Sequence, residues 1–167
     1  STFWPQLCLF QIGSSDEALA VDPLADGIDL TPLFALMANE AVLKVFHAGR
    51  QDIEILYNLA GAVPHPIFDT QLAAMVCGFG DSVGYETLVS KLLRKNLDKA
   101  SRFTDWARRP LTDRQLSYAL DDVIYLQDIY LKLHEQMEKS GRAHWLDEEM
   151  ELLASPTTYD LPPENAW

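Results

Sequence analysis

The stretch from Thr112 to about Lys139 constrains the fold most, because its apolar residues recur at the spacing of an α-helix. On a helical wheel the apolar residues form one stripe, consisting of Ala119, Val123, Leu126, Tyr130 and Leu133. The opposite stripe is polar and contains Ser117, Asp121, Asp128 and Glu135. A long helix with one apolar stripe must bury that stripe against other parts of the chain. The sequence therefore predicts a globular core that includes this helix.

Asp122 is the exception within the predicted helix. It falls beside Tyr118 and next to the apolar stripe, whereas its neighbour Asp121 falls on the polar stripe. A cap cannot explain a carboxylate in the middle of a helix. A carboxylate held away from water needs an arginine, a tyrosine hydrogen bond or a bound cation to compensate it. Tyr118 lies one turn earlier on the same face, where its phenol can reach a water held at the Asp122 carboxylate.

Asp52 is the corresponding exception in the helix predicted over residues 50–61. It lies inside the apolar arc of that helix, whereas Glu54 lies outside it. One interpretation is that the helix dipole and the free backbone amides of the first turn stabilise Asp52. The other is that Asp52 and Asp122 converge on hard divalent cations such as Mg²⁺ or Mn²⁺, which prefer oxygen ligands.

The order of the predicted elements indicates an α/β fold. We expect a hairpin over residues 6–13 and 17–24, a helix over 29–41 with Pro32 in its first turn, a buried strand over 42–49, a helix over 50–61 closed by Gly61, a loop over 62–70, and helices over 69–79, 85–96 and 112–139. Early strands with crossover helices, followed by helices, are typical of a mixed sheet covered by helices. Residues 1–150 are expected to form one domain. Residues 151–167 are rich in proline and are expected to be a linker.

The charge of the chain is divided unevenly. The net charge of −12 argues against a general nucleic-acid binder, which neutralises phosphates with Lys and Arg. Eight of the 13 basic residues nevertheless lie between Lys91 and Arg114, against three aspartates, which gives this segment a net charge of +5. Two interpretations stay open. The segment either holds a polyanion in one place or is a solvated pair of helices with a charge bias.

Nothing in the sequence predicts a membrane or secreted protein. No apolar run reaches the ~18 residues that span a bilayer, and the first residues do not resemble a signal peptide. Cys8 and Cys77 each lie in an apolar stretch, so we expect reduced core thiols and a cytoplasmic location.

Four segments together resemble bacterial ribonuclease D, a 3′→5′ exoribonuclease of the tyrosine-containing branch of the DEDD superfamily. They are "HAGRQDIEIL" (47–56), "FDTQLAA" (68–74), "LDKASRFTDWARRPLTDRQLSYALDDVIYL" (97–126) and the ending "PPENAW". The third segment is the most specific, because it matches Lys99, the Asp105-Trp106 pair, Arg109-Pro110-Leu111 and Tyr118-x-x-x-Asp122 in one run.

The resemblance implies a fold, a metal site and a reaction. The fold would be an α/β, ribonuclease-H-like mixed sheet flanked by helices. Asp52 and Asp122 would bind two divalent cations, Mg²⁺ or Mn²⁺, and Tyr118 would position the attacking water. The reaction would trim single-stranded RNA 3′ ends, such as those of tRNA precursors, and release nucleoside 5′-monophosphates.

Three further residues are predicted to bind substrate. His47 is expected to contact the RNA near Asp52, with a structural hydrogen bond to backbone as the alternative. Lys99 and Arg109 are expected to bind phosphates, although Arg109 could equally pair with Asp69 or Asp105. Asp69 is expected to cap the helix that follows it.

The sequence departs from the family in one respect. The family's first motif, Asp-x-Glu on the first strand, does not occur near the beginning of this sequence. We therefore expect the first strand to be missing from this segment and the segment alone to be inactive. We also expect a helical C-terminal domain to follow "PPENAW". Two alternatives remain open, namely a DNA 3′→5′ exonuclease of the same branch and a catalytically inactive member that binds RNA or a partner.

Overall fold

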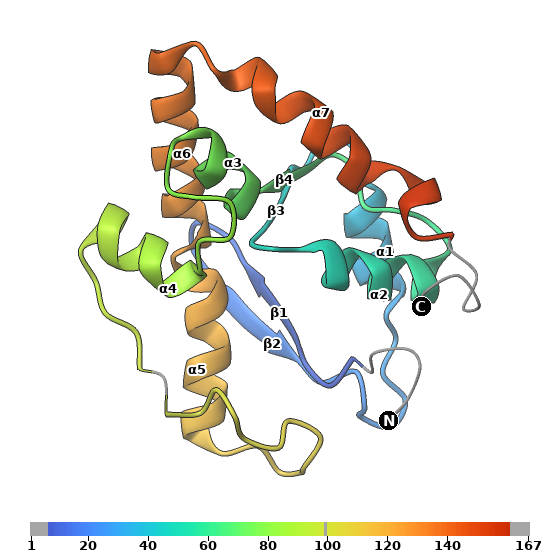
Figure 1. The fold of residues 1–167 in the computed structure, drawn as a ribbon. Helices are drawn as coiled ribbons and strands as arrows, with labels where there is room; N and C mark the ends of the chain where they lie inside the picture. The colour runs from blue at the N-terminus through green and yellow to red at the C-terminus, as the bar shows by residue number, and fades with distance from the viewer. Residues whose placement is uncertain (1–6, 99, 161–167) are drawn as a thin grey trace, which may run out of the picture.

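The computed structural model describes residues 7–98 and 100–160 and has a mixed α/β architecture (Figure 1). Four short strands lie in the middle, with helices on both sides. In chain order the elements are β1 (Phe10–Gly13), β2 (Ala18–Val21), α1 (Thr31–Ala38), β3 (Lys44–Phe46), α2 (Arg50–Ala60), β4 (Ile67–Asp69), α3 (Thr70–Val76), α4 (Tyr85–Leu88), a π-helical turn (Val89–Leu93), α5 (Asp113–Ile124), α6 (Leu126–Ser140), α7 (Ala143–Ala154) and a 3₁₀ turn (Pro156–Thr158).

The predicted hairpin is confirmed. Strands β1 and β2 pair antiparallel, with Phe10 opposite Val21 and Gly13 opposite Ala18. The pair packs against α5. A Cβ atom at Gly13 would lie 2.8 Å from the Val123 carbonyl oxygen, so glycine is what allows β1 to approach α5 this closely.

The second pair of strands was only half predicted. Strand β3 lies within the predicted strand over 42–49, but β4 lies in the segment expected to be a loop. All three β4 residues are buried, and they pair parallel with β3 in the register Lys44–Ile67. The loop prediction was wrong because three residues after two prolines carry no periodicity. Their conformation is set by their pairing partner.

The helices around the strands follow the sequence except in their lengths. Helix α1 begins with Pro32 in its first turn, and α2 ends at Gly61, whose φ of 73° is the left-handed conformation that glycine adopts readily. The single helix predicted over 112–139 is divided at Tyr125 into α5 and α6. The helix predicted over 85–96 is the short α4 followed by the π-helical turn.

Helix α7 was not predicted, and it continues into the segment expected to be a linker. It ends at Ala154, and Tyr159 beyond it is buried against Ile53 and Ile67. Within this segment Leu153 and Tyr159 are buried, whereas residues 161–167 lie outside the described part of the chain. The linker function stays a prediction.

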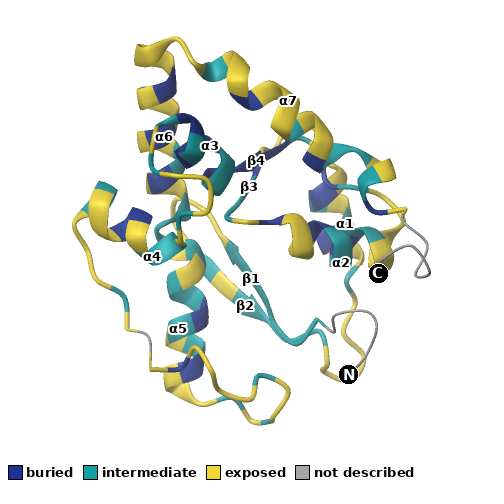
Figure 2. Cartoon of the chain, in the orientation of Figure 1, coloured by how far each residue is buried: buried dark blue, intermediate teal, exposed yellow. Residues whose placement is uncertain are grey.

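The largest cluster of the core lies between α3, α6 and α7, beside α4 and the π-helical turn. It consists of Phe68, Ala73, Ala74, Val76, Leu88, Val89, Ile129, Leu133, Met137 and Leu146. Figure 2 shows these buried faces turned toward one another and the exposed residues on the outer faces of α6 and α7. Within the described ranges, no helix has the length and apolarity to cross a membrane.

Truncation of Leu133 tests this core. Its side chain is fully buried, so Leu133→Ala is expected to lower the free energy of unfolding by about 2–5 kcal/mol. Leu131 lies on the same helix but is 54% exposed, so Leu131→Ala is the matched control and is expected to change stability by less than about 1 kcal/mol. Urea unfolding followed by circular dichroism measures both, and equal losses would contradict this description of the core.

Candidate active site

Asp52 and Asp122 face the same recess. A cavity of about 690 Å³ lies between β1 and β3, and its lining includes Asp52 from the first turn of α2 and Asp122 from α5. An adjoining cavity of about 300 Å³ is lined by both carboxylates together with Trp106 and Tyr118. Two residues 70 positions apart in sequence are thus brought to one site. Whether they bind metal stays a prediction at this point.

The helical wheel located these side chains correctly on their helices but misjudged their exposure. Asp122 is exposed and Asp121 is half-buried, which reverses the predicted order. Asp52 is exposed as well. The inward face of α5 at Asp122 is turned to the cavity, which water enters, and not to close-packed apolar side chains. The wheel cannot distinguish a recess from a packed core, because both lie on the inner side of a helix.

The two carboxylates have no counter-charge. Among the described residues, neither side chain forms an ion pair or a hydrogen bond, and Asp52 makes no capping bond at the start of α2. The protein walls of the recess, and after them the negative charges of Asp121, Glu86 and Asp52, raise the pKa of Asp122 to about 6. Desolvation and then Asp69 raise the pKa of Asp52. Such a site attracts cations, because its anions have no partner in the part of the chain that the structure describes.

Tyr118 is placed beside Asp122 as predicted, on the wall of the smaller cavity. Its ring lies 5.9 Å from that of Trp106, centroid to centroid. Burial, followed by the charge of Asp122, raises the pKa of the phenol. The Tyr118 hydroxyl therefore keeps its proton at neutral pH, and a protonated phenol can donate a hydrogen bond.

His47 lines the larger cavity, and one of its ring nitrogens contacts a side chain. Its Nδ1 lies 2.9 Å from Oγ1 of Thr70, and the Thr70 hydroxyl donates to the Phe46 carbonyl oxygen. Nε2 is buried without a hydrogen-bond partner in the described chain. Burial lowers the pKa of His47, so the ring is neutral near pH 7. The predicted RNA contact at His47 stays a prediction.

The carboxylate of Asp69 fixes the backbone on which Asp52 is mounted. It accepts hydrogen bonds from the amides of Gln71 (2.8 Å) and Leu72 (3.3 Å), which confirms the predicted cap of α3. It also accepts from the amides of Ala48 (3.2 Å) and Gly49 (2.7 Å), at the junction of β3 and α2. One buried side chain thus joins the starts of two helices, and Asp52 lies three residues beyond Gly49.

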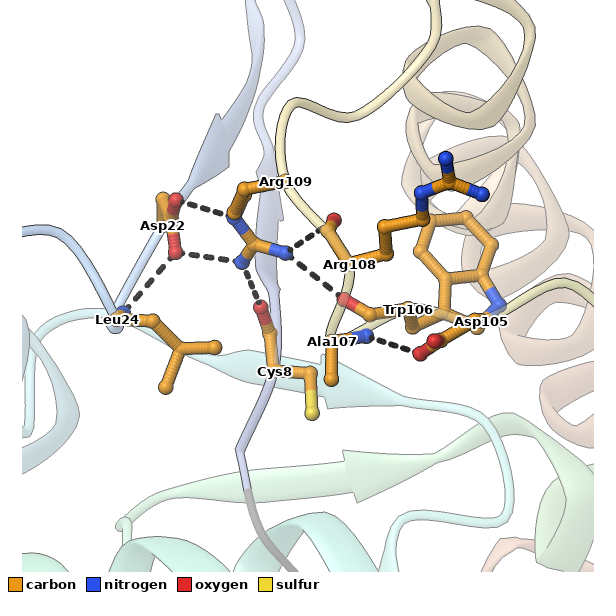
Figure 3. A network of polar contacts seen from close by, with 8 residues as sticks. All are labelled: Cys8, Asp22, Leu24, Asp105, Trp106, Ala107, Arg108 and Arg109. Carbon is orange, nitrogen blue, oxygen red and sulfur yellow. Dashed lines mark hydrogen bonds and ion pairs between the residues drawn. The ribbon is translucent and has the colours of Figure 1, made fainter.

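Arg109 forms an ion pair within the protein, as the alternative to phosphate binding predicted. Its partner is Asp22. Its guanidinium binds both carboxylate oxygens of Asp22 at 2.6 Å and donates to the carbonyl oxygens of Cys8, Trp106 and Arg108 (Figure 3). The pairing with Asp69 or Asp105 was therefore wrong. All five donors of the guanidinium are occupied. In return, Arg109 lowers the pKa of Asp22 to about 2.

The sequence analysis did not assign Trp106 or Glu86 to the site, and one residue that it did assign lies outside the described part of the chain. Trp106 is half-buried and lines the smaller cavity. Glu86 of α4 is near enough to raise the pKa values of Asp122 and Tyr118, and no spacing rule relates it to α5. Lys99 lies outside the described residues. Within residues 7–98 and 100–160, no cluster of three or more His, Cys, Asp or Glu residues is arranged to hold a metal.

A family model described as 3′-5′ exonuclease matches residues 2–138 of the chain. Ribonuclease D of Nitrobacter hamburgensis is 58% identical over 167 residues, which cover 100% of this chain and 44% of that protein. Ribonuclease D of Bartonella henselae is 54% identical over 167 residues, which cover 100% of this chain and 41% of that protein. The chain thus spans about two fifths of the length of the curated relatives it matches.

Solved structures are similar along nearly the whole chain. The crystal structure of Escherichia coli RNase D has a TM-score of 0.90 at 36% identity, covering 96% of this chain and 42% of that one. Brucella melitensis NrnC with bound Mg²⁺ has a TM-score of 0.81 at 29% identity, covering 93% and 76%. NrnC bound to pGG has a TM-score of 0.83 at 30% identity, with the same coverage. The predicted similarity to ribonuclease D and the predicted α/β fold class are both confirmed.

The raised pKa of Asp122 predicts a pH-dependent gain in stability for Asp122→Asn. The pKa of Asp122 is about 6 in the folded protein and about 3.9 in the unfolded chain. The protein therefore loses unfolding free energy as the pH rises through that interval. Well below pH 4 both states hold the proton and the penalty is absent. With EDTA present, Asp122→Asn is expected to be more stable than wild type by about 1 kcal/mol at pH 7.5, after a reduction for solvent screening, and equal to it at about pH 2.5. Thermal unfolding at both pH values measures this, and a pH-independent difference would contradict it.

The backbone clamp at Asp69 predicts a larger loss than an ordinary cap. Asp69→Ala leaves four amides without their acceptor and is expected to cost about 2–4 kcal/mol of unfolding free energy. Asp29→Ala is the control, because Asp29 accepts from one exposed amide, that of Thr31. Chemical unfolding of both variants gives the comparison. Losses of the same size would show that the bonds to Ala48 and Gly49 contribute nothing.

Proposed function

The chain belongs to the 3′-5′ exonuclease family, and we propose that it is the catalytic domain of a 3′→5′ exoribonuclease that uses two divalent cations. The observation that carries the proposal is the pair of unneutralised carboxylates, Asp52 and Asp122, on one recess. The relatives named ribonuclease D support RNA as the substrate, and Mg²⁺ in NrnC supports a divalent cation.

The residues present fit such cations. Asp52 and Asp122 supply hard oxygen ligands, have no partner among the described residues and repel each other. A bound cation would relieve both their desolvation and their repulsion. The cations supply a nucleophilic water and stabilise the charge that develops on the phosphate. Binding also lowers the pKa of Asp122 from about 6, because a neighbouring cation favours the ionised carboxylate.

Tyr118 acts by orientation. Its protonated hydroxyl donates a hydrogen bond into the cavity beside Asp122, where it holds the attacking water or a phosphate oxygen of the terminal nucleotide. Trp106 supports this position from the adjacent wall of the cavity. The hydrolysis we propose releases nucleoside 5′-monophosphates one at a time from single-stranded 3′ ends, including those of tRNA precursors.

The larger cavity also has room for the strand that carries the Asp-x-Glu motif of the family. Strand β1 pairs only with β2, and β3 only with β4, within the described chain. Their remaining edges border the cavity that contains Asp52 and Asp122. Free strand edges on both sides of one recess suit the insertion of an extended segment by backbone hydrogen bonding. We propose that an Asp-x-Glu segment occupies this position and adds the oxygen ligands that two carboxylates alone do not provide.

Asp122→Asn tests the metal site in the natural full-length protein. We expect Mg²⁺- or Mn²⁺-dependent trimming of a single-stranded RNA to fall by more than roughly 100-fold. Loss of a residue that only hydrogen-bonds to a metal ligand already costs roughly 10- to 100-fold. Mn²⁺ affinity, measured by calorimetry, should fall with it. Asp128→Asn is the control, because Asp128 is an exposed carboxylate on α6. Undiminished hydrolysis by Asp122→Asn would refute the assignment of Asp122 to the metal site.

A DNA oligonucleotide of the same sequence, tested with the wild-type protein, measures the preference for RNA.

Tyr118→Phe separates orientation from metal binding. It removes the hydroxyl but keeps the ring beside Trp106. We expect kcat to fall roughly 10- to 1,000-fold, while the affinity for Mn²⁺ changes by less than about threefold. Single-turnover hydrolysis and calorimetry give the two values. A parallel loss of metal affinity would show that Tyr118 belongs to the metal site itself.

A further inference from the structure

The loop between the π-helical turn and α5 presents an aromatic ring to solvent. Phe103 is 92% exposed, more than any other large apolar side chain in the described chain. The guanidinium carbon of Arg102 lies 5.4 Å from the centre of its ring. A ring that contacts little protein but is covered by a cation on one side resembles the stacking surfaces on which nucleobases bind.

The turn that carries Phe103 is anchored on both sides of the ring. Ser101 is buried, and its carbonyl oxygen accepts from the amide and the hydroxyl of Thr104 at 3.3 and 2.9 Å. Nε2 of Gln115 donates to Thr104 Oγ1 at 3.1 Å and to the Asp105 carbonyl oxygen at 3.3 Å. Gln115 itself is buried and completes the capping box of α5 with Thr112. Phe103 therefore stands on a fixed turn and not on a free loop.

The same anchoring sets where the ring lies relative to the candidate active site. Gln115 lies three residues before Tyr118 and seven before Asp122 on α5, a rise of about 10 Å from Gln115 to Asp122. Three residues after Phe103, Trp106 lines the cavity of Asp52 and Asp122. The positive charge of Arg102 lowers the pKa of Tyr118, against the effects of burial and Asp122, so Arg102 lies within electrostatic reach of the site.

The cations around the ring are available for phosphates. Arg109 is engaged by Asp22 and Arg114 lies 3.6 Å from Asp98, whereas Arg102 and Arg108 form no ion pair with any described residue. We propose that Phe103, with Arg102, stacks a nucleobase upstream of the scissile phosphate and so directs the 3′ strand into the cavity. This inference rests on the proposed function, because it identifies a contact for the same RNA substrate.

The test measures binding without hydrolysis. The full-length protein and a fluorescently labelled single-stranded oligoadenylate are mixed in EDTA, and fluorescence anisotropy gives the dissociation constant. Phe103→Ala is expected to weaken binding about 5- to 100-fold, the range for loss of one base–aromatic stack. Phe103→Trp should bind within about threefold of wild type, whereas Phe103→Leu should bind as weakly as alanine. A Leu variant that binds like wild type would overturn stacking.

The matched control is a second exposed aromatic with the same kind of arginine. Trp145 is 56% exposed, and the guanidinium carbon of Arg142 lies 5.4 Å from its ring. It lies at the start of α7, at the other end of the α5–α6 column from the Phe103 loop (Figure 1). Trp145→Ala is expected to leave RNA affinity unchanged. An equal loss in the two alanine variants would overturn the proposal.

An abasic scan identifies the stacked base. Each oligoadenylate carries one abasic nucleotide, placed at successive positions from the 3′ end. At one position the missing base should lower the affinity of the wild-type protein but should not lower the affinity of Phe103→Ala any further. A phenyl ring that serves protein association would instead give unchanged RNA affinity with altered mass by light scattering, which also overturns the proposal. Mg²⁺-dependent hydrolysis by wild type is measured separately, so failure of the proposed function is distinguishable from failure of the stacking contact.

Discussion

The hydrogen bonds of Asp69 hold the candidate site together. One carboxylate at the end of β4 accepts from four backbone amides, two at the start of α3 and two at the junction of β3 and α2. The parallel pair of strands is too short to fix two helices by itself, with only three residues in each strand. Asp69 supplies the missing constraint, and the direction of α2, and hence of Asp52, follows from it. Its negative charge also raises the pKa of Asp52.

The fold retains an electrostatic cost at the recess. The charges of Asp52 and Asp122 act on each other, and no described residue pairs either carboxylate with a cation, although the chain has 13 basic residues. Arginine is used elsewhere, as Arg109 holds Asp22 with both oxygens and ties the chain before β1 to the loop before α5. Asp52 and Asp122 have no such partner among the described residues, and this is the environment in which a bound cation would relieve the cost, as proposed for this site.

Helical periodicity was enough to assign Asp52, Tyr118 and Asp122 to the inner faces of their helices, because it depends only on local geometry. It could not find the break at Tyr125 or the strand β4, which depend on packing between distant segments. Nor could it pair Arg109 with Asp22, 87 residues away, or distinguish a water-filled recess from a core at Asp122. The prediction that the segment needs a further strand stays open. The two free strand edges on the cavity agree with it.

The basic segment from Lys91 to Arg114 was open to two interpretations, a site for a polyanion or a solvated pair of helices. The described residues between the π-helical turn and α5 form a loop, so the pair of helices was wrong, and the polyanion site stays a prediction. Arg109 is structural, because its donors are all occupied. Its ion pair fixes one end of the loop and Gln115 fixes the other, which turns Trp106 toward the cavity and leaves Phe103 in solvent. Arg102 therefore lies at a fixed place beside an acidic recess and forms no ion pair within residues 7–98 and 100–160. Such a place suits a polyanion that must approach carboxylates, because the cation offsets a repulsion that would otherwise exclude it.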